Sequence, residues 1–198
     1  MADLVIVPTG TANLASVIAA FRRLDAEAVV TADPAAIRTA AHVMLPGVGT
    51  FGSSMERLAA AGADVALRER IAADRPTIAI CVGHQLLFAT SDESPGARGL
   101  GVVPTHVGRF PEDVRVPQFG WNAVQAGEDG RLVEDGWAYF ANSYRATSAP
   151  GWKVATAEHG GPFIAAMECG NVVTCQFHPE LSGAYGAALL SRWLTLRC

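Results

Sequence analysis

The chain has 198 residues, of which 50% are hydrophobic and 17% charged, so we expect one domain over residues 1–198 with a substantial core. Its net charge of −4 provides no positive field to gather phosphates, which argues against nucleic acid as a partner. No apolar stretch approaches the roughly 20 residues that span a bilayer, and the N-terminus lacks the basic start of a secretory signal. The sequence therefore predicts a cytoplasmic protein without membrane contact.

The first part of the chain alternates predicted strands and helices. Short apolar runs predict strands, and one-sided apolar spacing predicts helices. The strands are expected at residues 4–7, 28–31, 42–45 and 77–80, and the helices at residues 13–24, from Pro34, and at 53–60 and 63–73. This alternation is typical of a parallel sheet with helices on its faces.

From residue 99 the pattern changes to short strands separated by Gly, Pro and Asp. They are expected at residues 102–107, 118–124, 137–141, 154–158, 163–168 and 172–177, before a closing helix at residues 183–196. Such strands suit an antiparallel addition to the sheet. We therefore expect an α/β fold with a mixed, mostly parallel central sheet, flanking helices and a small antiparallel extension.

Cys81 follows the apolar strand at residues 77–80 directly, and a helix expected to begin at Gly83 and include Phe88 comes next. A strand, a sharp turn and a helix form a nucleophile elbow, which would project Cys81 from the end of the sheet. A helix N-terminus near the sulfur favours the thiolate. Cys81 is therefore the candidate nucleophile, and a buried cysteine acting as a small hydrophobic residue is the alternative.

A glycine-rich turn follows the strand at residues 42–45. Its sequence is Pro46-Gly47-Val48-Gly49-Thr50-Phe51-Gly52. Ligands of open α/β sheets bind at this carboxyl edge, and such a turn can direct backbone N–H groups at an anion. A tight turn into the next helix is the alternative.

His178 and Glu180 follow the last predicted strand in the sequence His178-Pro179-Glu180. A base at one strand end beside a nucleophile at another is what nucleophilic catalysis needs, and Glu180 can hold the imidazole in the useful tautomer. A lone histidine is more often structural. Its combination with the cysteine elbow favours a catalytic role.

Several motifs resemble the class I (triad-type) glutamine amidotransferases over nearly the whole chain. They are AICVGHQLL around Cys81, QFHPE around His178 and the PGVG turn. Within that family the chain is most similar to the glutaminase subunits of imidazole glycerol phosphate synthase. That similarity rests on LPGVGTFGSSM at residues 45–55, VPQFGWN at 116–122, YFANSY at 139–144 and QFHPELSG at 176–183.

The resemblance implies that Cys81 attacks the side-chain amide of L-glutamine, forms a thioester and releases ammonia, after which water frees glutamate. It implies no cofactor and no metal. Backbone N–H groups of Val82 and of the Gly47–Val48 pair would stabilise the oxyanion. The residues that would bind glutamine are Gly49, Gln85, Glu93, Ser143 and Tyr144.

The acceptor enzyme must be another chain, because a (β/α)₈ barrel synthase needs about 250 residues of its own. The resemblance implies a heterodimer with such a synthase (cyclase) subunit, which makes imidazole glycerol phosphate and AICAR in histidine biosynthesis. Alternatives are an amidotransferase subunit of a different synthase, a catalytically silent regulatory subunit, and a cysteine peptidase with the same elbow. The glutamine-site residues argue against the peptidase.

Three departures from the subfamily pattern bear on the partner. Residues 8–13 read PTGTAN where the subfamily has Asp-Tyr-Gly-x-Gly-Asn, His84 replaces a methionine, and Asn142 replaces a histidine. We expect residues 8–13 and Asn142 to tune the partner interface. We also expect the partner to switch on the glutaminase through the PGVG turn, where Gly47 and Gly49 can change φ at little cost.

Overall fold

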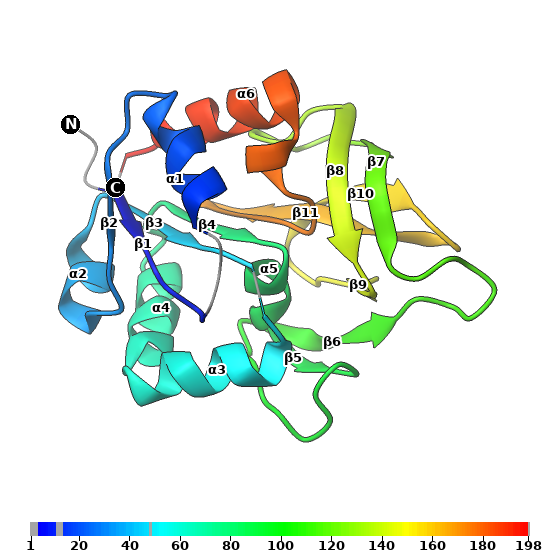
Figure 1. The fold of residues 1–198 in the computed structure, drawn as a ribbon, viewed down its shortest axis with the longest axis horizontal. Helices are drawn as coiled ribbons and strands as arrows, with labels where there is room; N and C mark the ends of the chain where they lie inside the picture. Colours follow the sequence, from blue (N-terminus) through cyan, green and yellow to red (C-terminus); the bar gives the residue numbers. More distant parts are fainter. Residues whose placement is uncertain (1–3, 11–13, 48, 198) are drawn as a thin grey trace.

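A seven-stranded sheet forms the centre of the molecule in the computed structural model, which describes residues 4–10, 14–47 and 49–197 (Figure 1). Its order is β10-β11-β12-β4-β3-β1-β2. The parallel strands are β1 (Leu4–Ile6), β2 (Ala28–Val30), β3 (His42–Leu45), β4 (Thr77–Ile80) and β12 (Val172–Cys175). Strands β10 (Lys153–Glu158) and β11 (Pro162–Cys169) continue the sheet with antiparallel pairing. The predicted mixed, mostly parallel sheet is confirmed.

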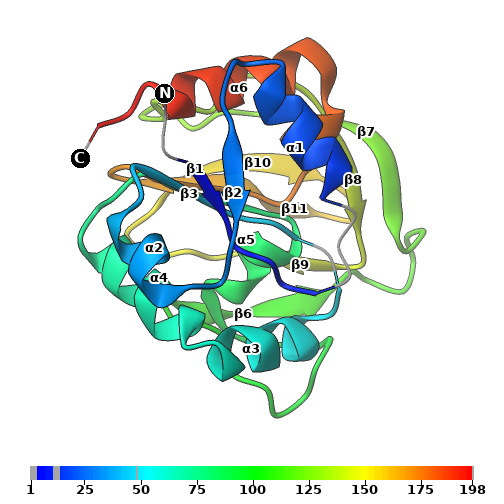
Figure 2. The same cartoon turned by 60° about the vertical axis from the view of Figure 1, so that its left-hand side comes forward.

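Helices cover both faces of this sheet (Figure 2). On one face lie α1 (Ala15–Arg22) and α6 (Gly183–Leu194), whose Phe21 and Trp193 rings pack with centroids 6.0 Å apart. On the other lie α2 (Pro34–Thr39), α3 (Phe51–Ala60) and α4 (Ala63–Ala72). Among the helices in the described ranges, none has the length and apolar character needed to cross a membrane.

The remaining strands form two small sheets rather than one extension of the central sheet. The strands β5 (Phe88–Ser91), β6 (Val103–Arg109) and β9 (Tyr144–Ala146) make one of them. The strands β7 (Gln118–Val124) and β8 (Gly136–Asn142) pair as an antiparallel ribbon beside the central sheet (Figure 1). Two of these strands, β5 and β9, were not predicted.

The helix after Cys81 is much shorter than the sequence predicted. It is α5 (Val82–Leu86), and Phe88 already belongs to β5, where it pairs with Val103 of β6. Pairing with a distant strand overrides the local helical spacing here. Gly99 permits this route, because a Cβ at that position would lie 2.1 Å from the Phe88 carbonyl oxygen.

Arg70 of α4 anchors the region before β4 from inside the core. It is 1% exposed, and its guanidinium donates to the carbonyl oxygens of Ala40 at 2.7 Å and Pro76 at 2.8 Å and to Thr77 Oγ1 at 3.1 Å. These acceptors belong to the segments that lead into β3 and β4. The buried charge is stabilised by these bonds, so α4 is held in register with the strand that ends at Cys81.

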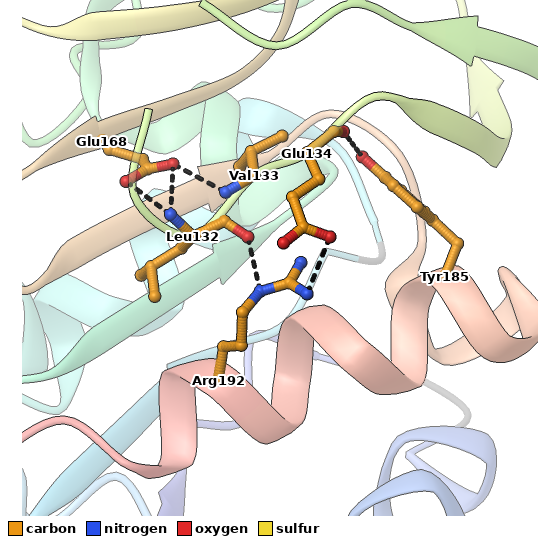
Figure 3. Close-up of polar contacts among 6 residues, drawn as sticks. All are labelled: Leu132, Val133, Glu134, Glu168, Tyr185 and Arg192. Atoms are coloured by element: carbon orange, nitrogen blue, oxygen red, sulfur yellow. Dashed lines mark hydrogen bonds and ion pairs between the residues drawn. The ribbon is translucent and has the colours of Figure 1, made fainter. Parts of the chain in front are cut away.

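A buried carboxylate of the central sheet holds part of the connection between β7 and β8, which spans residues 125–135 (Figure 3). Glu168 of β11, which is 5% exposed, accepts hydrogen bonds from the backbone N–H groups of Arg131, Leu132 and Val133 at 2.8–3.1 Å. Bonds from N–H groups to an ionised acceptor are among the stronger ones in proteins. We call this contact the Glu168 clasp.

Helix α6 holds the same connection from its other side (Figure 3). Arg192 donates to the Leu132 carbonyl at 2.9 Å and pairs with the Glu134 carboxylate at 3.0 Å, while the Tyr185 hydroxyl donates to the Glu134 carbonyl at 2.8 Å. The β7–β8 ribbon is therefore fixed relative to both β11 and α6.

Candidate active site

The strand, turn and helix predicted around Cys81 are present, and the turn is strained. Cys81 has φ 52° and ψ −111° between β4 and α5, a conformation that costs a non-glycine residue on the order of 1–3 kcal/mol. Its backbone N–H donates to the Cys175 carbonyl of β12 at 2.7 Å. Since α5 has only five residues, its dipole is weaker than that of the long helix expected from the sequence.

Two glycines let the end of β3 lie directly against this turn. A Cβ at Gly47 would lie 1.9 Å from the Ile80 carbonyl oxygen and 2.3 Å from the Val82 nitrogen, and a Cβ at Gly83 would lie 2.3 Å from the Leu45 carbonyl oxygen. No side chain fits at either position. The glycine turn and the cysteine elbow therefore interlock through their backbones.

This close approach gives Gly47 a role that the sequence did not predict. Gly49 has a positive φ of +102° and Gly47 does not, and Gly47 is also required for proximity to the elbow, so the expectation that both glycines change φ stays a prediction. Val48, the residue between them, lies outside the described residues. Gly47 is thus close to the Val82 nitrogen, as the expected oxyanion site requires.

His178 and Glu180 lie in contact at the end of β12. Glu180 stands in the short 3₁₀ helix η1 (Pro179–Leu181), and its Oε1 lies 2.8 Å from His178 Nδ1. The two side chains are 12% and 6% exposed, and Cys81, which is itself 6% exposed, is close enough to His178 to raise the pKa of the imidazole. The structure therefore brings the three predicted catalytic residues together in one buried cluster.

The surroundings of His178 favour its protonated form. Burial lowers the pKa of His178, but the hydrogen bonds to Cys81 and Glu180 and the negative charges of these two residues outweigh burial and raise it well above 6.5. Near neutral pH the imidazole therefore carries the proton that a leaving group next to Cys81 would need.

The expected glutamine-binding residues are held by hydrogen bonds to neighbouring segments. Gln85 of α5 is 3% exposed and donates from Nε2 to the Tyr144 carbonyl at 3.3 Å. The Ser143 carbonyl accepts from the Phe110 N–H at 3.2 Å, at the end of β6. Glu93 Oε2 accepts from the N–H of Phe51 at 2.6 Å and so caps the first turn of α3, next to Gly49. Gln85 belongs to the elbow helix α5, and Glu93 binds the helix that follows the glycine turn.

Two of the departures noted in the sequence are interior residues. Asn142 is 4% exposed, and its Nδ2 donates to the Tyr144 carbonyl at 3.0 Å, so it offers a partner little surface of its own, and the expectation that it tunes the interface stays a prediction. His84 is fully buried, with Nδ1 2.6 Å from Thr174 Oγ1, and burial lowers its pKa from 6.5 to about 3. It remains neutral and stands outside the Cys81 cluster.

The segment at residues 8–13 is described only in part. Thr9 is 1% exposed and its hydroxyl donates to the Pro46 carbonyl at 3.5 Å, so it touches the first residue of the glycine turn. Residues 11–13 lie outside the described residues. The expectation that this segment tunes a partner interface stays a prediction.

Gln176 is a residue of the site that sequence reasoning missed. It is fully buried, its Oε1 accepts from Gln85 Nε2 at 2.9 Å, and its Nε2 lies 3.8 Å from Cys81 Sγ. The signal was its place two residues before His178 in the QFHPE motif, at the end of a strand that pairs with the strand before Cys81.

An α/β sheet with a cysteine elbow and a His–Glu pair at its carboxyl edge defines a class of amidotransferase. A family profile described as "Glutamine amidotransferase class-I" matches residues 9–195, and the chain belongs to that family. Over its whole length it is 40% identical to 96% of a protein of Symbiobacterium thermophilum named imidazole glycerol phosphate synthase subunit HisH. Within the class I amidotransferases the chain belongs with these HisH subunits, which confirms the resemblance seen in the sequence.

A longer relative and a solved structure extend this comparison. A chloroplastic protein of Arabidopsis thaliana, named imidazole glycerol phosphate synthase hisHF, is 40% identical over 93% of this chain, which spans 33% of that protein. A crystal structure of a glutamine amidotransferase has a TM-score of 0.76 at 20% identity, with 96% of each chain covered. That structure supports the fold, and the sequence relatives support the family.

Proposed function

We propose that the chain is the glutaminase subunit of imidazole glycerol phosphate synthase, which hydrolyses L-glutamine and passes ammonia to a separate cyclase subunit for histidine biosynthesis. The observation that carries the chemistry is the strained Cys81 elbow beside His178, whose pKa is raised and whose ring Glu180 orients. The 40% identity to HisH subunits supports the choice of synthase. The composition favours a cytoplasmic location.

In the proposed reaction, Cys81 Sγ attacks the carboxamide carbon of glutamine, and the negative charge moves to the carboxamide oxygen. The Val82 N–H, together with an N–H of the Gly47–Val48 pair, would stabilise this oxyanion. The C–N bond breaks as His178 gives its proton to the nitrogen, so ammonia leaves and a thioester remains. His178 then takes a proton from water, the water oxygen attacks the thioester, and the C–S bond breaks to give glutamate and the regenerated cysteine.

The glutamine head group would lie between Gln85, Glu93 and the Ser143–Tyr144 strand end, with Gly49 alongside. The α-ammonium of glutamine favours a carboxylate partner, which Glu93 can supply at the N-terminal end of α3. Since the Gln85 amide is held by the Tyr144 carbonyl, these two residues would position the substrate together.

The exposed face of the β7–β8 ribbon is the surface we assign to the cyclase. Phe119, Trp121 and Trp137 are 71%, 55% and 62% exposed, and the strand register places them on the same side of the ribbon as Tyr139. Exposed aromatic groups of this size mark interaction sites more often than free surface. The threefold length of the Arabidopsis relative supports a second functional part beside this domain.

This aromatic face is connected directly to the catalytic turn. The His178 N–H donates to the Tyr139 carbonyl at 2.8 Å, and the Ser182 hydroxyl accepts from the Tyr139 N–H at 2.9 Å and donates to the His178 carbonyl at 2.6 Å. A cyclase on the ribbon would thus contact the strand that positions His178. We propose that the cyclase activates the glutaminase by binding the ribbon, and that the glycine turn changes conformation at Gly49 in response.

The decisive experiment measures glutamate release from L-glutamine by the isolated chain, by the chain with an imidazole glycerol phosphate cyclase subunit, and by that complex with the cyclase's nucleotide substrate. We expect release to rise with each addition. In Cys81→Ala the release should vanish while the circular dichroism spectrum stays that of wild type. Release by Cys81→Ala, or none by the wild-type complex, would contradict the proposed function.

A further inference from the structure

Gln176 bridges the expected substrate residue Gln85 and the nucleophile Cys81. It is completely buried at the end of β12, where its backbone N–H donates to the Ala165 carbonyl of β11 at 2.8 Å. We propose that Gln176 is a positioning residue that holds the Cys81 sulfur and favours its thiolate by directing an amide N–H at it. The inference rests on the proposed function in one respect: it takes Cys81 to be the nucleophile of the glutaminase reaction.

The orientation of the Gln176 amide follows from a chain of hydrogen bonds that starts at a carbonyl. The Tyr144 carbonyl can only accept, so the Gln85 atom that faces it at 3.3 Å must be the amide nitrogen. The same nitrogen lies 2.9 Å from Gln176, which therefore turns its oxygen toward Gln85. The Gln176 nitrogen is then left facing Cys81 Sγ at 3.8 Å.

The first acceptor in this series of hydrogen bonds, the Tyr144 carbonyl, also binds a second donor. Asn142 Nδ2 donates to the same Tyr144 carbonyl at 3.0 Å, so that one oxygen accepts from two amide groups. Flipping Gln85 would set its oxygen against the Tyr144 carbonyl oxygen, which replaces a donated hydrogen bond by an unfavourable contact between two acceptors. The amide of Gln176 thus has one favoured orientation, with its donors toward the sulfur.

Burial makes this donor effective. Gln176, Gln85 and Cys81 are 0%, 3% and 6% exposed, so water competes little for their hydrogen bonds. A hydrogen bond to a charged acceptor is stronger than one between neutral groups, and a low local dielectric strengthens it further. The N–H of Gln176 therefore stabilises a thiolate more than a thiol. It acts from the Gln85 side, whereas His178 is a separate group near the sulfur.

The test replaces one atom of Gln176. Gln176→Glu keeps the length of the side chain and an oxygen that accepts from Gln85, but it offers the sulfur a carboxylate oxygen in place of N–H. The matched control is Thr174→Val, because Thr174 lies in β12 two residues before Gln176, is equally buried and also loses one side-chain hydrogen bond, to His84. Alkylation of Cys81 by iodoacetamide is followed from pH 5 to 10, with the labelled peptide identified by mass spectrometry.

We expect the midpoint of the alkylation profile to rise by about one pH unit or more in Gln176→Glu, which makes labelling at low pH about tenfold slower, since one unit is a tenfold change in thiolate. Thr174→Val should keep the wild-type midpoint. A midpoint in Gln176→Glu equal to that of wild type would overturn the proposal. If circular dichroism shows that this variant does not fold, Gln176→Met is judged by the same criterion, because it removes the donor without adding charge.

The alkylation readout requires neither glutamine nor the cyclase, so it separates this inference from the proposed function. If the alkylation midpoint shifts in Gln176→Glu but the wild-type complex never releases glutamate, the positioning role of Gln176 is supported and the glutaminase assignment is wrong. If the wild-type complex releases glutamate but the midpoint does not shift, the glutaminase assignment is supported and the positioning role is wrong. In the active complex, Gln176→Glu should lower kcat more than it changes KM, because the residue acts on the nucleophile.

Discussion

His84 makes the stability of this protein sensitive to acid, and replacing it with methionine should remove that sensitivity. The ring is fully buried, with only Thr174 Oγ1 bonded to Nδ1 and with Phe88 packed edge-on at 5.3 Å, and burial lowers its pKa from 6.5 to about 3. Below pH 6.5 the unfolded chain binds a proton at this residue and the folded chain does not. Stability contributed by the neutral ring is therefore complete above pH 6.5 and is lost as the pH falls toward 3.

The size of this loss of stability follows from the lowered pKa of His84. Each pH unit within the window changes the free energy of unfolding by about 1.4 kcal/mol, so the loss from pH 7.5 to 5.0 is about 2 kcal/mol. His84→Met has no titrating group there, and its effects on packing and on the Thr174 hydroxyl do not depend on pH. The difference between variant and wild type should therefore grow by about 2 kcal/mol in favour of the variant over this range.

Urea unfolding of both proteins, with cysteines kept reduced, measures this difference at pH 7.5, 6.5, 5.5 and 5.0. Other titrating groups, including the buried His42, are present in both proteins, so their contributions to the free energy of unfolding cancel in the difference. Parallel stability curves for His84→Met and wild type over these pH values would show that His84 takes up its proton in the folded state, and the reasoning from burial would be wrong.

Further predictions concern catalysis and partner binding. His178→Ala should lower glutamate release by the cyclase complex at least about 10³-fold and Glu180→Gln by less, with thermal melts that show folded protein; near-normal release by His178→Ala would remove it from the mechanism. Gly47→Ala should prevent formation of the elbow, since the added Cβ would lie 1.9 Å from the Ile80 carbonyl oxygen. Low solubility of the variant, or loss of Cys81 labelling by iodoacetamide, would show this. Gly49→Ala should fold with a strain of about 1–3 kcal/mol at φ +102° and respond less to the cyclase; activation equal to that of wild type would exclude this turn as the responding element. Trp137→Ala should weaken cyclase binding about 30-fold by calorimetry, as expected of an interface aromatic worth about 2 kcal/mol, and unchanged affinity would move the interface away from the ribbon.

The sequence predicted the parts of the fold that depend on local pattern. The four-residue runs before Pro46 and Cys81 are strands β3 and β4 with the predicted bounds, because they are buried on both faces and so are apolar after their first residues, His42 and Thr77. The pairing of His178 with Glu180 could also be predicted, since two residues separated by one proline stay close in any compact turn.

The sequence could not predict features that depend on distant segments. Phe88 has helical spacing with the residues before it, but its pairing with β6 decides its conformation. Tyr144 to Ala146 form a strand because β6 lies beside them, and nothing in three residues reveals that partner. The role of Gln176 depends on Gln85, 91 positions away, and the burial of Asn142 depends on the carbonyl of Tyr144 that it contacts.

The Glu168 clasp has a consequence for how proteases meet this protein. Long connections between strands are usually the first places where a folded chain is nicked, because a protease must bind the backbone in an extended form. Here the backbone at Arg131, a trypsin-type cleavage position, is held by the carboxylate of Glu168, so cleavage requires the clasp to open first. The connection should therefore resist trypsin for as long as β11 stays folded, and its cutting would report local opening of the sheet edge rather than motion of the ribbon itself.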